Sequence, residues 1–249
     1  MHTKDSLIAQ LSAMLPSDAT VLMHSSCKSL GQMENGGDTI LDALTEYFSR
    51  GLVVLPTHTW ATVNDRQPVY DVLYTPVCIG LLPELFRKRP GVHRSWHPTH
   101  SVAAFGADAE EFVRGDENCP TPCARDSAWG RLYDRDAYVL LVGVELNRMT
   151  FFHGVEEWNG IPGRLKETPN RYVVIPPDGG RIVQDYYPHC GDSSQLYPKA
   201  ETALLHAGAM RMEKLGDATV RLLSCRKSAE VVSSLLKDNP FFFGKAGYR

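Results

Sequence analysis

Apolar runs and amphipathic segments alternate along the first part of the chain. Apolar residues at positions 7, 8, 11 and 15 recur near the helical period, and TVLMH at 20–24 is a short apolar run typical of a buried strand. Residues 39–49 carry apolar side chains at 40, 41, 44 and 48 on one helical face, with Asp38 or Thr39 as the expected N-cap. Gly51 and the apolar run LVVLPT follow, so strand, helix and strand predict a right-handed parallel crossover.

The rest of the chain predicts further helices, strands and one hairpin. We expect helices at 79–88, 107–114, 197–206 and 227–236, and strands at 101–105, 137–144 and 217–223. The run at 137–144, AYVLLVGV, is the most apolar of the chain and predicts a central strand. Strands at 172–175 and 182–186 flank PPDGG, a linker typical of an antiparallel hairpin.

These elements together predict the fold class. The order of helices and strands is typical of an α/β protein, a three-layer sandwich with a mixed, mostly parallel central sheet flanked by helices. The hairpin is expected to form an antiparallel extension. The 249 residues, 43% of them hydrophobic, suffice for a single domain spanning 1–249.

Charge and hydropathy exclude several kinds of partner. The 26 basic and 29 acidic residues give a formal charge of −3, without the basic excess that marks nucleic-acid binders. No apolar stretch approaches the roughly 18 residues of a membrane span, and the first residues lack a secretory pattern. We therefore expect a cytoplasmic protein without a nucleic-acid or membrane partner, and the sequence does not predict its oligomeric state.

Cysteine and histidine spacing gives little support for a metal. The six cysteines are scattered and are expected to be free thiols, and no second pair completes a zinc site with Cys119 and Cys123 of CPTPC. His97 and His100, with His153 as a third ligand, would suggest a metal hydrolase. Pro98 argues against a helical histidine pair, and no H-E-x-x-H motif is present. We therefore expect no metal and keep the hydrolase as the weaker alternative.

Polar loops after predicted strands are the candidate sites, because open α/β sheets bind ligands beyond the carboxyl ends of their strands. The loop HSSCKSLGQMENGG begins at His24, and its small residues and Lys28 suit a phosphate or a carbonyl oxygen, although a structural turn is the simpler interpretation. It contains neither a Walker motif nor a dinucleotide fingerprint. A second loop, PTHTW at 56–60, gives His58 no definite role.

A third loop, GVELNRMTFFHGVEEW at 143–158, pairs a histidine with two acids. Glu156 and Glu157 follow His153 by three and four residues, so on a helix either carboxylate can lie beside the imidazole. A carboxylate that fixes one imidazole nitrogen leaves the other to accept a proton, as general-base catalysis requires. From this pattern alone, a solvated acidic helix is the simpler interpretation.

Five motifs occur in order between residues 20 and 160. They are HSSCKSLG at 24–31, the glycine pair at 36–37, the Pro-Thr pair at 56–57, HPTHS at 97–101 and TFFHGVE at 150–156. In order and spacing they resemble the aminoglycoside 3-N-acetyltransferase family, and GDATVRL at 216–222 resembles the family's late strand. The resemblance implies acetyl-coenzyme A as cosubstrate and, as acceptor, the 3-amino group of an aminoglycoside antibiotic, so that the enzyme would confer resistance.

The resemblance also implies roles for individual residues. His153 corresponds to the family's catalytic histidine and Glu156 to its carboxylate partner, although Glu157 is a second candidate for that role. For a cationic acceptor, negative charge is expected from Glu156, Glu157, Asp65 and Asp71. The residues expected to bind the cofactor come from the first loop and the HP-x-x-S segment: Ser25, Ser26, Lys28, Ser29, Leu30, Gly31 and Ser101.

The expected reaction is direct transfer within a ternary complex. His153 removes a proton as the amine attacks the thioester, Glu156 stabilises the charged imidazole, and backbone N–H groups of residues 25–31 support the oxyanion. Cys27 suggests a covalent alternative, but the family pattern does not require a cysteine there. Two further alternatives are transfer to a different amine and a non-catalytic coenzyme A-binding module.

Overall fold

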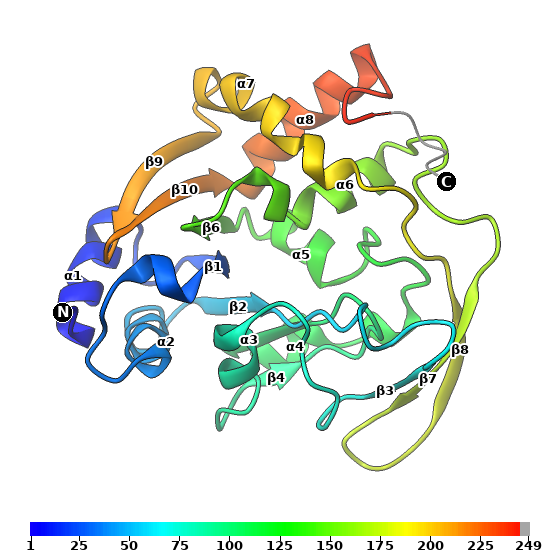
Figure 1. The fold of residues 1–249 in the computed structure, drawn as a ribbon, viewed down its shortest axis with the longest axis horizontal. Coiled ribbons are helices and arrows are strands. Elements are labelled where there is room, and N and C mark those ends of the chain that lie inside the picture. Colours follow the sequence, from blue (N-terminus) through cyan, green and yellow to red (C-terminus); the bar gives the residue numbers. More distant parts are fainter. Residues whose placement is uncertain (245–249) are drawn as a thin grey trace.

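The computed structural model describes residues 1–244 and contains two sheets (Figure 1). The larger has the strand order β4-β5-β2-β1-β6-β10-β9, and the smaller has the order β3-β7-β8. The strands are β1 Thr20–Ser25, β2 Leu52–Pro56, β3 Val69–Asp71, β4 His93–Arg94, β5 Val102–Gly106, β6 Tyr138–Val142, β7 Asn170–Ile175, β8 Ile182–Tyr186, β9 Met210–Leu215 and β10 Ala218–Ser224.

Helices flank the larger sheet. The α-helices are α1 Lys4–Met14, α2 Gly37–Tyr47, α3 Leu81–Phe86, α4 Ala109–Val113, α5 Ala128–Asp134, α6 Phe151–Trp158, α7 Glu201–His206 and α8 Cys225–Asp238. Short 3-10 helices are η1 Cys27–Leu30, η2 Asp116–Asn118, η3 Leu146–Arg148 and η4 Ser193–Ala200. Side-chain caps fix where several of them begin: Thr3, Ser127 and Ser224 accept hydrogen bonds from the first-turn N–H groups of α1, α5 and α8.

The larger sheet is mixed, as predicted, but it is not mostly parallel. Strand β1 pairs in parallel with β2 and β6, which confirms the crossover and the interior position of β6. Strands β5, β4, β10 and β9 all join by antiparallel pairing. For β4–β5 and β9–β10 the physical reason is the short connection, because parallel neighbours need a crossover of a dozen or more residues.

The two faces of the larger sheet bury separate cores, which confirms the three-layer arrangement. Val21 and Met23 of β1 pack on one face with residues of α1, α2 and α3. Leu22 points to the other face, where α4, α5, α6 and α8 pack. This alternation is the period of two expected for a strand buried on both sides.

Two predicted helices begin differently from the expectation. Helix α2 starts at Gly37, after Gly36 adopts a positive φ of 57°, and Thr39 instead accepts a hydrogen bond from the Asn35 backbone N–H. The segment predicted as one helix from 197 consists of η4 and then α7, because Pro198 has no N–H to donate within an α-helix. Strands β3, β4 and β9 and helix α5 were not predicted.

The smaller sheet has its own small core of Val63, Tyr70, Val72, Tyr172, Val174 and Tyr186. Strands β7 and β8 form the predicted antiparallel hairpin, which extends from the body of the molecule at the right of Figure 1. Strand β3 joins this hairpin in parallel and pairs Val69 with Val173. The sheet therefore connects the segment after β2 to a distant part of the chain.

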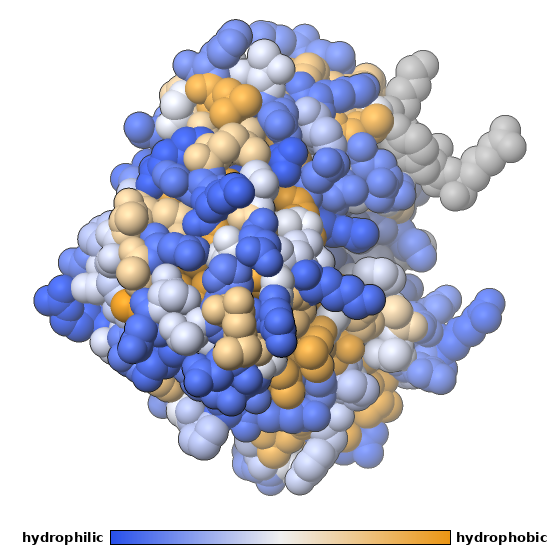
Figure 2. All heavy atoms as spheres, turned by 60° about the vertical axis from the view of Figure 1, so that its left-hand side comes forward, coloured by the Kyte–Doolittle hydropathy of each residue, from blue (hydrophilic) through white to orange (hydrophobic). Residues whose placement is uncertain are grey.

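The surface on the N-terminal side carries mixed hydrophilic and hydrophobic residues. Figure 2 shows hydrophobic residues there in small groups separated by hydrophilic ones. Among residues 1–244, no helix combines the length and the apolar character that crossing a bilayer would require.

Candidate active site

A cavity of about 710 Å³ opens beyond the carboxyl ends of the central strands. Ser25 at the end of β1 and Pro56 at the end of β2 line it, and Val144 follows β6 into its wall. The strand order places the crevice where the parallel strands end, which is the position expected for a ligand in an open α/β sheet. His153 and His189 also line it, from α6 and from the loop after β8.

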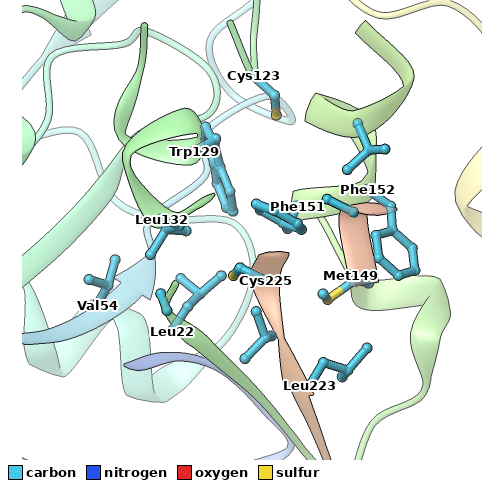
Figure 3. Packing of buried hydrophobic residues seen from close by; sticks show 14 of the residues in the cluster. Leu22, Val54, Cys123, Trp129, Leu132, Met149, Phe151, Phe152, Leu223 and Cys225 are labelled. Carbon is cyan, nitrogen blue, oxygen red and sulfur yellow. The ribbon is translucent and has the colours of Figure 1, made fainter. Parts of the chain in front are cut away.

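Helix α6 positions His153 at the cavity wall. Phe151, Phe152 and Val155 are fully buried in the core beneath, where Figure 3 shows the two phenylalanines with Trp129. These apolar side chains fix the rotation of the helix about its axis, so the imidazole of His153 faces the cavity.

The carboxylate of Glu156 is surrounded by hydrogen-bond donors. Its Oε2 lies 3.4 Å from His153 Nδ1, 2.9 Å from Ser193 Oγ and 2.6 Å from Tyr197 Oη, and Arg164 Nε lies 3.0 Å away. Burial alone would raise the pKa of this carboxyl, but hydrogen bonding to His153 and the charge of Arg164 hold it below its usual value. Glu156 is therefore an ionised partner for the imidazole.

Two further side chains contact the Nδ1 atom of His153. Arg164 Nη2 lies 2.6 Å from Nδ1, and the hydroxyl of Tyr197 is in hydrogen-bond contact with the same atom. Because the Tyr197 hydroxyl donates to Glu156, its oxygen can accept from Nδ1–H, whereas a contact from Arg164 favours the opposite tautomer. In the first tautomer the other nitrogen, Nε2, carries the lone pair that a base requires.

Burial keeps His153 neutral at neutral pH. Desolvation, reinforced by the charge of Arg164, lowers the pKa of His153 to about 4, although Glu156 opposes the shift. The imidazole is consequently neutral at neutral pH, with one nitrogen protonated and the other able to accept a proton.

Glu157 faces away from His153. Its carboxylate accepts hydrogen bonds from Thr121 Oγ1 at 2.6 Å and from the Cys123 backbone N–H at 2.9 Å, and it contacts His189 Nε2. Burial raises the pKa of Glu157 to about 7, despite these hydrogen bonds. Of the two acids, Glu156 is therefore the one that adjoins the imidazole.

Several histidines gather around the cavity. The ring of His58 lies 4.8 Å from that of His100, His100 lies 5.2 Å from His189, and His189 lies 4.9 Å from His153, between centroids. The Nε2 atoms of His24 and His58 are buried and have no hydrogen-bond partner among residues 1–244. Both residues line the cavity, although these Nε2 atoms are themselves buried.

The predicted cofactor residues of the first loop are only partly at the cavity. Ser25 lines it, while Lys28 is exposed on η1. The N–H groups of Ser26, Ser29 and Gly31 donate to carbonyls of Val142, Ser26 and Lys28, so they already have partners. Leu30 is fully buried in the core, so its side chain does not make the expected ligand contact.

Two other predicted residues lie elsewhere. Ser101 is fully buried, and its hydroxyl donates to the Thr57 carbonyl at 2.8 Å, which ties the start of β5 to the end of β2. Its side chain therefore has a structural contact in place of the expected cofactor contact. Asp65 is exposed and outside the cavity lining, and Asp71 is also outside it.

The histidine triad considered for a metal does not converge. His97 Nδ1 accepts hydrogen bonds from the backbone N–H groups of Thr99 and His100, so it stabilises a turn. Within residues 1–244, the three-residue group whose ligand atoms come together contains neither His97, His100 nor His153. These positions give no support to the metal hydrolase.

Sequence reasoning missed the residues that hold His153 and Glu156. Arg164, Ser193 and Tyr197 reach Glu156 from segments that carry no recognisable motif, and His189 lies in an irregular loop. His24 belongs to the HSS motif, so that motif was a signal for its place at the cavity.

The sequence comparisons agree with the motifs. A family model described as aminoglycoside 3-N-acetyltransferase matches residues 22–237. The SPbeta prophage-derived aminoglycoside N(3')-acetyltransferase-like protein YokD of Bacillus subtilis (strain 168) is 28% identical over 96% of this chain and 93% of its own. Aminoglycoside N(3)-acetyltransferase VII of Streptomyces paromomycinus is 30% identical over 74% of this chain and 70% of its own.

Solved structures share the fold. The apoenzyme of aminoglycoside acetyltransferase AAC(3)-IVa has a TM-score of 0.83 and 26% identity, covering 97% of this chain and 90% of its own. A histidine-to-alanine variant of that enzyme has been solved in complex with a gentamicin. AAC-IIIb, solved with coenzyme A, has a TM-score of 0.82 over 99% of both chains, and at 23% identity it shows the common fold.

Proposed function

Because this chain belongs to the aminoglycoside 3-N-acetyltransferase family, we propose that it transfers the acetyl group of acetyl-coenzyme A to an amine of an aminoglycoside. The observation that carries the proposal is the contact of His153 with ionised Glu156 at the wall of the cavity. The relatives are named acetyltransferases, and a solved structure of similar fold holds a gentamicin. The fold and the motifs therefore support the same activity.

In the proposed mechanism His153 acts as general base. The amine nitrogen attacks the thioester carbonyl, its proton passes to His153 Nε2, and Nδ1–H is held by Tyr197 and Glu156. The carbon–nitrogen bond forms and the carbon–sulfur bond breaks. The proton on His153 then returns to the departing thiolate. Glu156 stabilises the transient imidazolium, whose formation the Arg164 charge opposes.

A covalent acetyl-enzyme is not part of the proposal. Cys27 lies in η1, and Cys78 lines the cavity. Burial raises the pKa of both thiols above the usual value, so little of the nucleophilic thiolate is present at neutral pH. Direct transfer, as expected from the sequence, fits these surroundings better.

The cavity offers polar groups to the acetyl-coenzyme A cosubstrate. Ser25, His24 and His58 line the cavity next to the ends of β1 and β2. These groups are suited to the thioester and amide groups of the reactive arm. Lys28, exposed in the first loop, is suited to a phosphate.

A second candidate acceptor is an amine that also carries an anionic group. The charged residues lining the cavity are Arg148, Arg164 and Asp192, and Arg164 is paired with Glu156. With Asp65 outside the lining and Glu157 engaged by Thr121 and Cys123, a polycation has few carboxylates to bind. Arg148 instead favours a carboxylate or phosphate on the acceptor.

An acceptor panel tests both proposals. Release of free coenzyme A thiol and the mass of the acetylated product would be followed with gentamicin, apramycin and amines bearing a carboxylate or a phosphate. Acetylated gentamicin or apramycin supports the first candidate, and acetylation confined to anionic amines supports the second. Absence of product with every amine, in protein that binds coenzyme A, would favour the non-catalytic binding module.

The variant Arg148→Gln separates the two candidates further. It should raise the KM of an anionic amine by up to about 5-fold and leave the KM of an aminoglycoside nearly unchanged, since Arg148 is exposed and exposed ion pairs contribute ~0–1 kcal/mol. Arg181→Gln is the matched control, because Arg181 is exposed and outside the cavity lining.

A further inference from the structure

We propose that Cys123, Glu157 and His189 form a binding site for a zinc ion beside the catalytic pair. The Sγ atom of Cys123, a carboxylate oxygen of Glu157 and a ring nitrogen of His189 all lie within 4.8 Å of one another. Zinc bonds of about 2.0–2.3 Å hold tetrahedral ligand atoms about 3.3–3.8 Å apart, so small side-chain movements complete the site. The proposal does not depend on the identity of the acceptor.

The three ligands come from separate segments and are enclosed by protein. Cys123 belongs to the CPTPC loop, Glu157 to α6 and His189 to the loop after β8. Cys123 is fully buried, and the side chains of Glu157 and His189 are 5% and 10% exposed. Surface acids converge by chance more often than a buried thiol, carboxylate and imidazole do, because burial without a partner is costly.

The backbone around the ligands is well anchored. The Cys123 carbonyl accepts a hydrogen bond from Trp158 Nε1 at 2.9 Å, and its N–H donates to Glu157 at 2.9 Å. On the other side, Lys166 and Cys190 donate backbone hydrogen bonds across the strand-like pairing of Leu165 with His189. Thr121 donates to the second carboxylate oxygen and orients it, the role of an outer partner in metal sites.

The donor set selects zinc by its charge and chemistry. A thiolate, a carboxylate and a neutral imidazole together balance the two positive charges of zinc, so the occupied site is neutral overall. Binding displaces the thiol proton of Cys123, and any proton on Glu157, to solvent. The sulfur and nitrogen ligands disfavour magnesium and calcium, which prefer oxygen.

The sequence predicts no metal because a second cysteine pair and an H-E-x-x-H motif are absent and Pro98 argues against a helical histidine pair. The site uses only one cysteine of CPTPC, and its other ligands lie far along the chain, so no sequence spacing reveals it. With three protein ligands, the fourth tetrahedral position is left to a solvent molecule. The alternative is a metal-free network in which His189 donates its Nε2 hydrogen to Glu157.

Metal titration of the full chain distinguishes the zinc site from the metal-free network. Protein stripped with a chelator would be titrated with zinc against a chromophoric competitor and, separately, with cobalt(II). We expect one zinc per chain and a thiolate-to-cobalt charge-transfer band. Absence of one-to-one zinc binding, or a cobalt spectrum without that band, would overturn the proposal.

Two cysteine variants locate the site. Cys123→Ser should lose the band and weaken zinc binding by more than about 100-fold, because loss of a ligand exceeds the 10- to 100-fold effect of outer-shell changes. Cys119→Ser, four residues away in the same loop, should keep both. A band that survives in Cys123→Ser, or disappears in Cys119→Ser, contradicts the assignment. If Cys123→Ser does not fold, Glu157→Gln replaces it, with the same weakening of zinc binding expected.

Discussion

The imidazole of His153 and the carboxylate of Glu156 meet one turn apart on α6, with Nδ1 3.4 Å from Oε2. The neighbouring acid, Glu157, projects from the same helix toward Cys123 and His189. A difference of one position thus separates a carboxylate beside the proposed base from one in a different network.

Removal of the proposed base should abolish most transfer without unfolding the protein. For His153→Ala we expect kcat to fall about 10²–10⁴-fold, the usual contribution of general-base catalysis. Steady-state thiol release gives kcat, and circular dichroism checks the fold. A variant that keeps more than half of the wild-type rate would contradict the assignment.

Neutralising Glu156 should impair transfer more than neutralising Glu157. In Glu156→Gln an amide group replaces the carboxylate that accepts hydrogen bonds from Ser193 and Tyr197 and forms an ion pair with Arg164, so we expect losses in both kcat and thermal stability. Glu157→Gln keeps an acceptor for Thr121 and should change kcat less. The comparison uses kcat at saturating substrates, and the reverse ranking would assign the supporting role to Glu157.

Stability should rise with pH between about 4.5 and 6.5. Burial lowers the pKa of His24 and His97 to about 3 and lowers that of His58 as well, so in this window the unfolded chain binds protons that the folded chain does not. Each such proton adds about 1.4 kcal/mol of stability per pH unit as pH rises.

Two raised carboxyl groups act in the opposite direction. Burial raises the pKa of Asp116 to about 6 and that of Glu157 to about 7, so in the folded state these carboxyl groups bind protons that the unfolded chain has already lost. Their effect is to lower the stability of the protein as pH rises. The histidines with lowered pKa outnumber them, so the net stability still increases. Urea unfolding at several pH values measures the slope. Equal stability at pH 5 and pH 6.5 would show that the imidazoles are accessible to protons in the folded state.

Gly143 permits the close approach of η1 to the end of β6. Its φ is 64°, and a Cβ there would overlap the side chain of Ser29. Gly143→Ala should therefore destabilise the protein by more than the ~1–3 kcal/mol of backbone strain alone. Gly208→Ala is the control, since Gly208 has a similar φ of 60° and open space around it. Equal changes in the urea midpoint for both variants would contradict the predicted contact.

Lys28 should have a modest role in cosubstrate binding. Because it is exposed, Lys28→Ala should raise the KM of acetyl-coenzyme A by no more than about 5-fold, the range of ~0–1 kcal/mol for exposed ion pairs, and leave the acceptor KM unchanged. Calorimetric titration of coenzyme A at fixed salt gives the dissociation constants. Identical constants for wild type and variant would make Lys28 a solvated loop residue only.

Elements with strong periodicity were predictable from the sequence. The apolar runs of β1, β2 and β6 and the amphipathic pattern of α2 are local properties, and they determine both faces of the sheet. Strand β9 was missed because it is an edge strand that carries the charged residues Arg211, Glu213 and Lys214. The direction of several strands also could not be predicted. It depends on which strands are neighbours along the chain, and short strands such as β4 have patterns too weak to be recognised.

The candidate site likewise contains one part that local sequence predicts and another that only the tertiary fold brings together. His153 shares one helix with Glu156 and Glu157, so their spacing predicted that one of the two acids adjoins the imidazole, and the structure shows that it is Glu156. Tyr197 and Arg164 reach that pair only through the tertiary fold. A motif indicates that Leu30 belongs to a loop, whereas only the structure shows that its side chain is buried in the core.

The smaller sheet also affects the order in which the chain assembles. The pairing of Val69 with Val173 closes a long loop that contains β4, β5, β6 and α6. Closing this loop costs less entropy once most of the larger sheet has formed, so the pairing is expected to form late. With a core separate from the two large ones, this sheet can open as its own cooperative unit. His58 and Trp60 of the cavity wall precede β3, and His189 follows β8, so such an opening loosens both sides of the cavity while the main sheet stays folded.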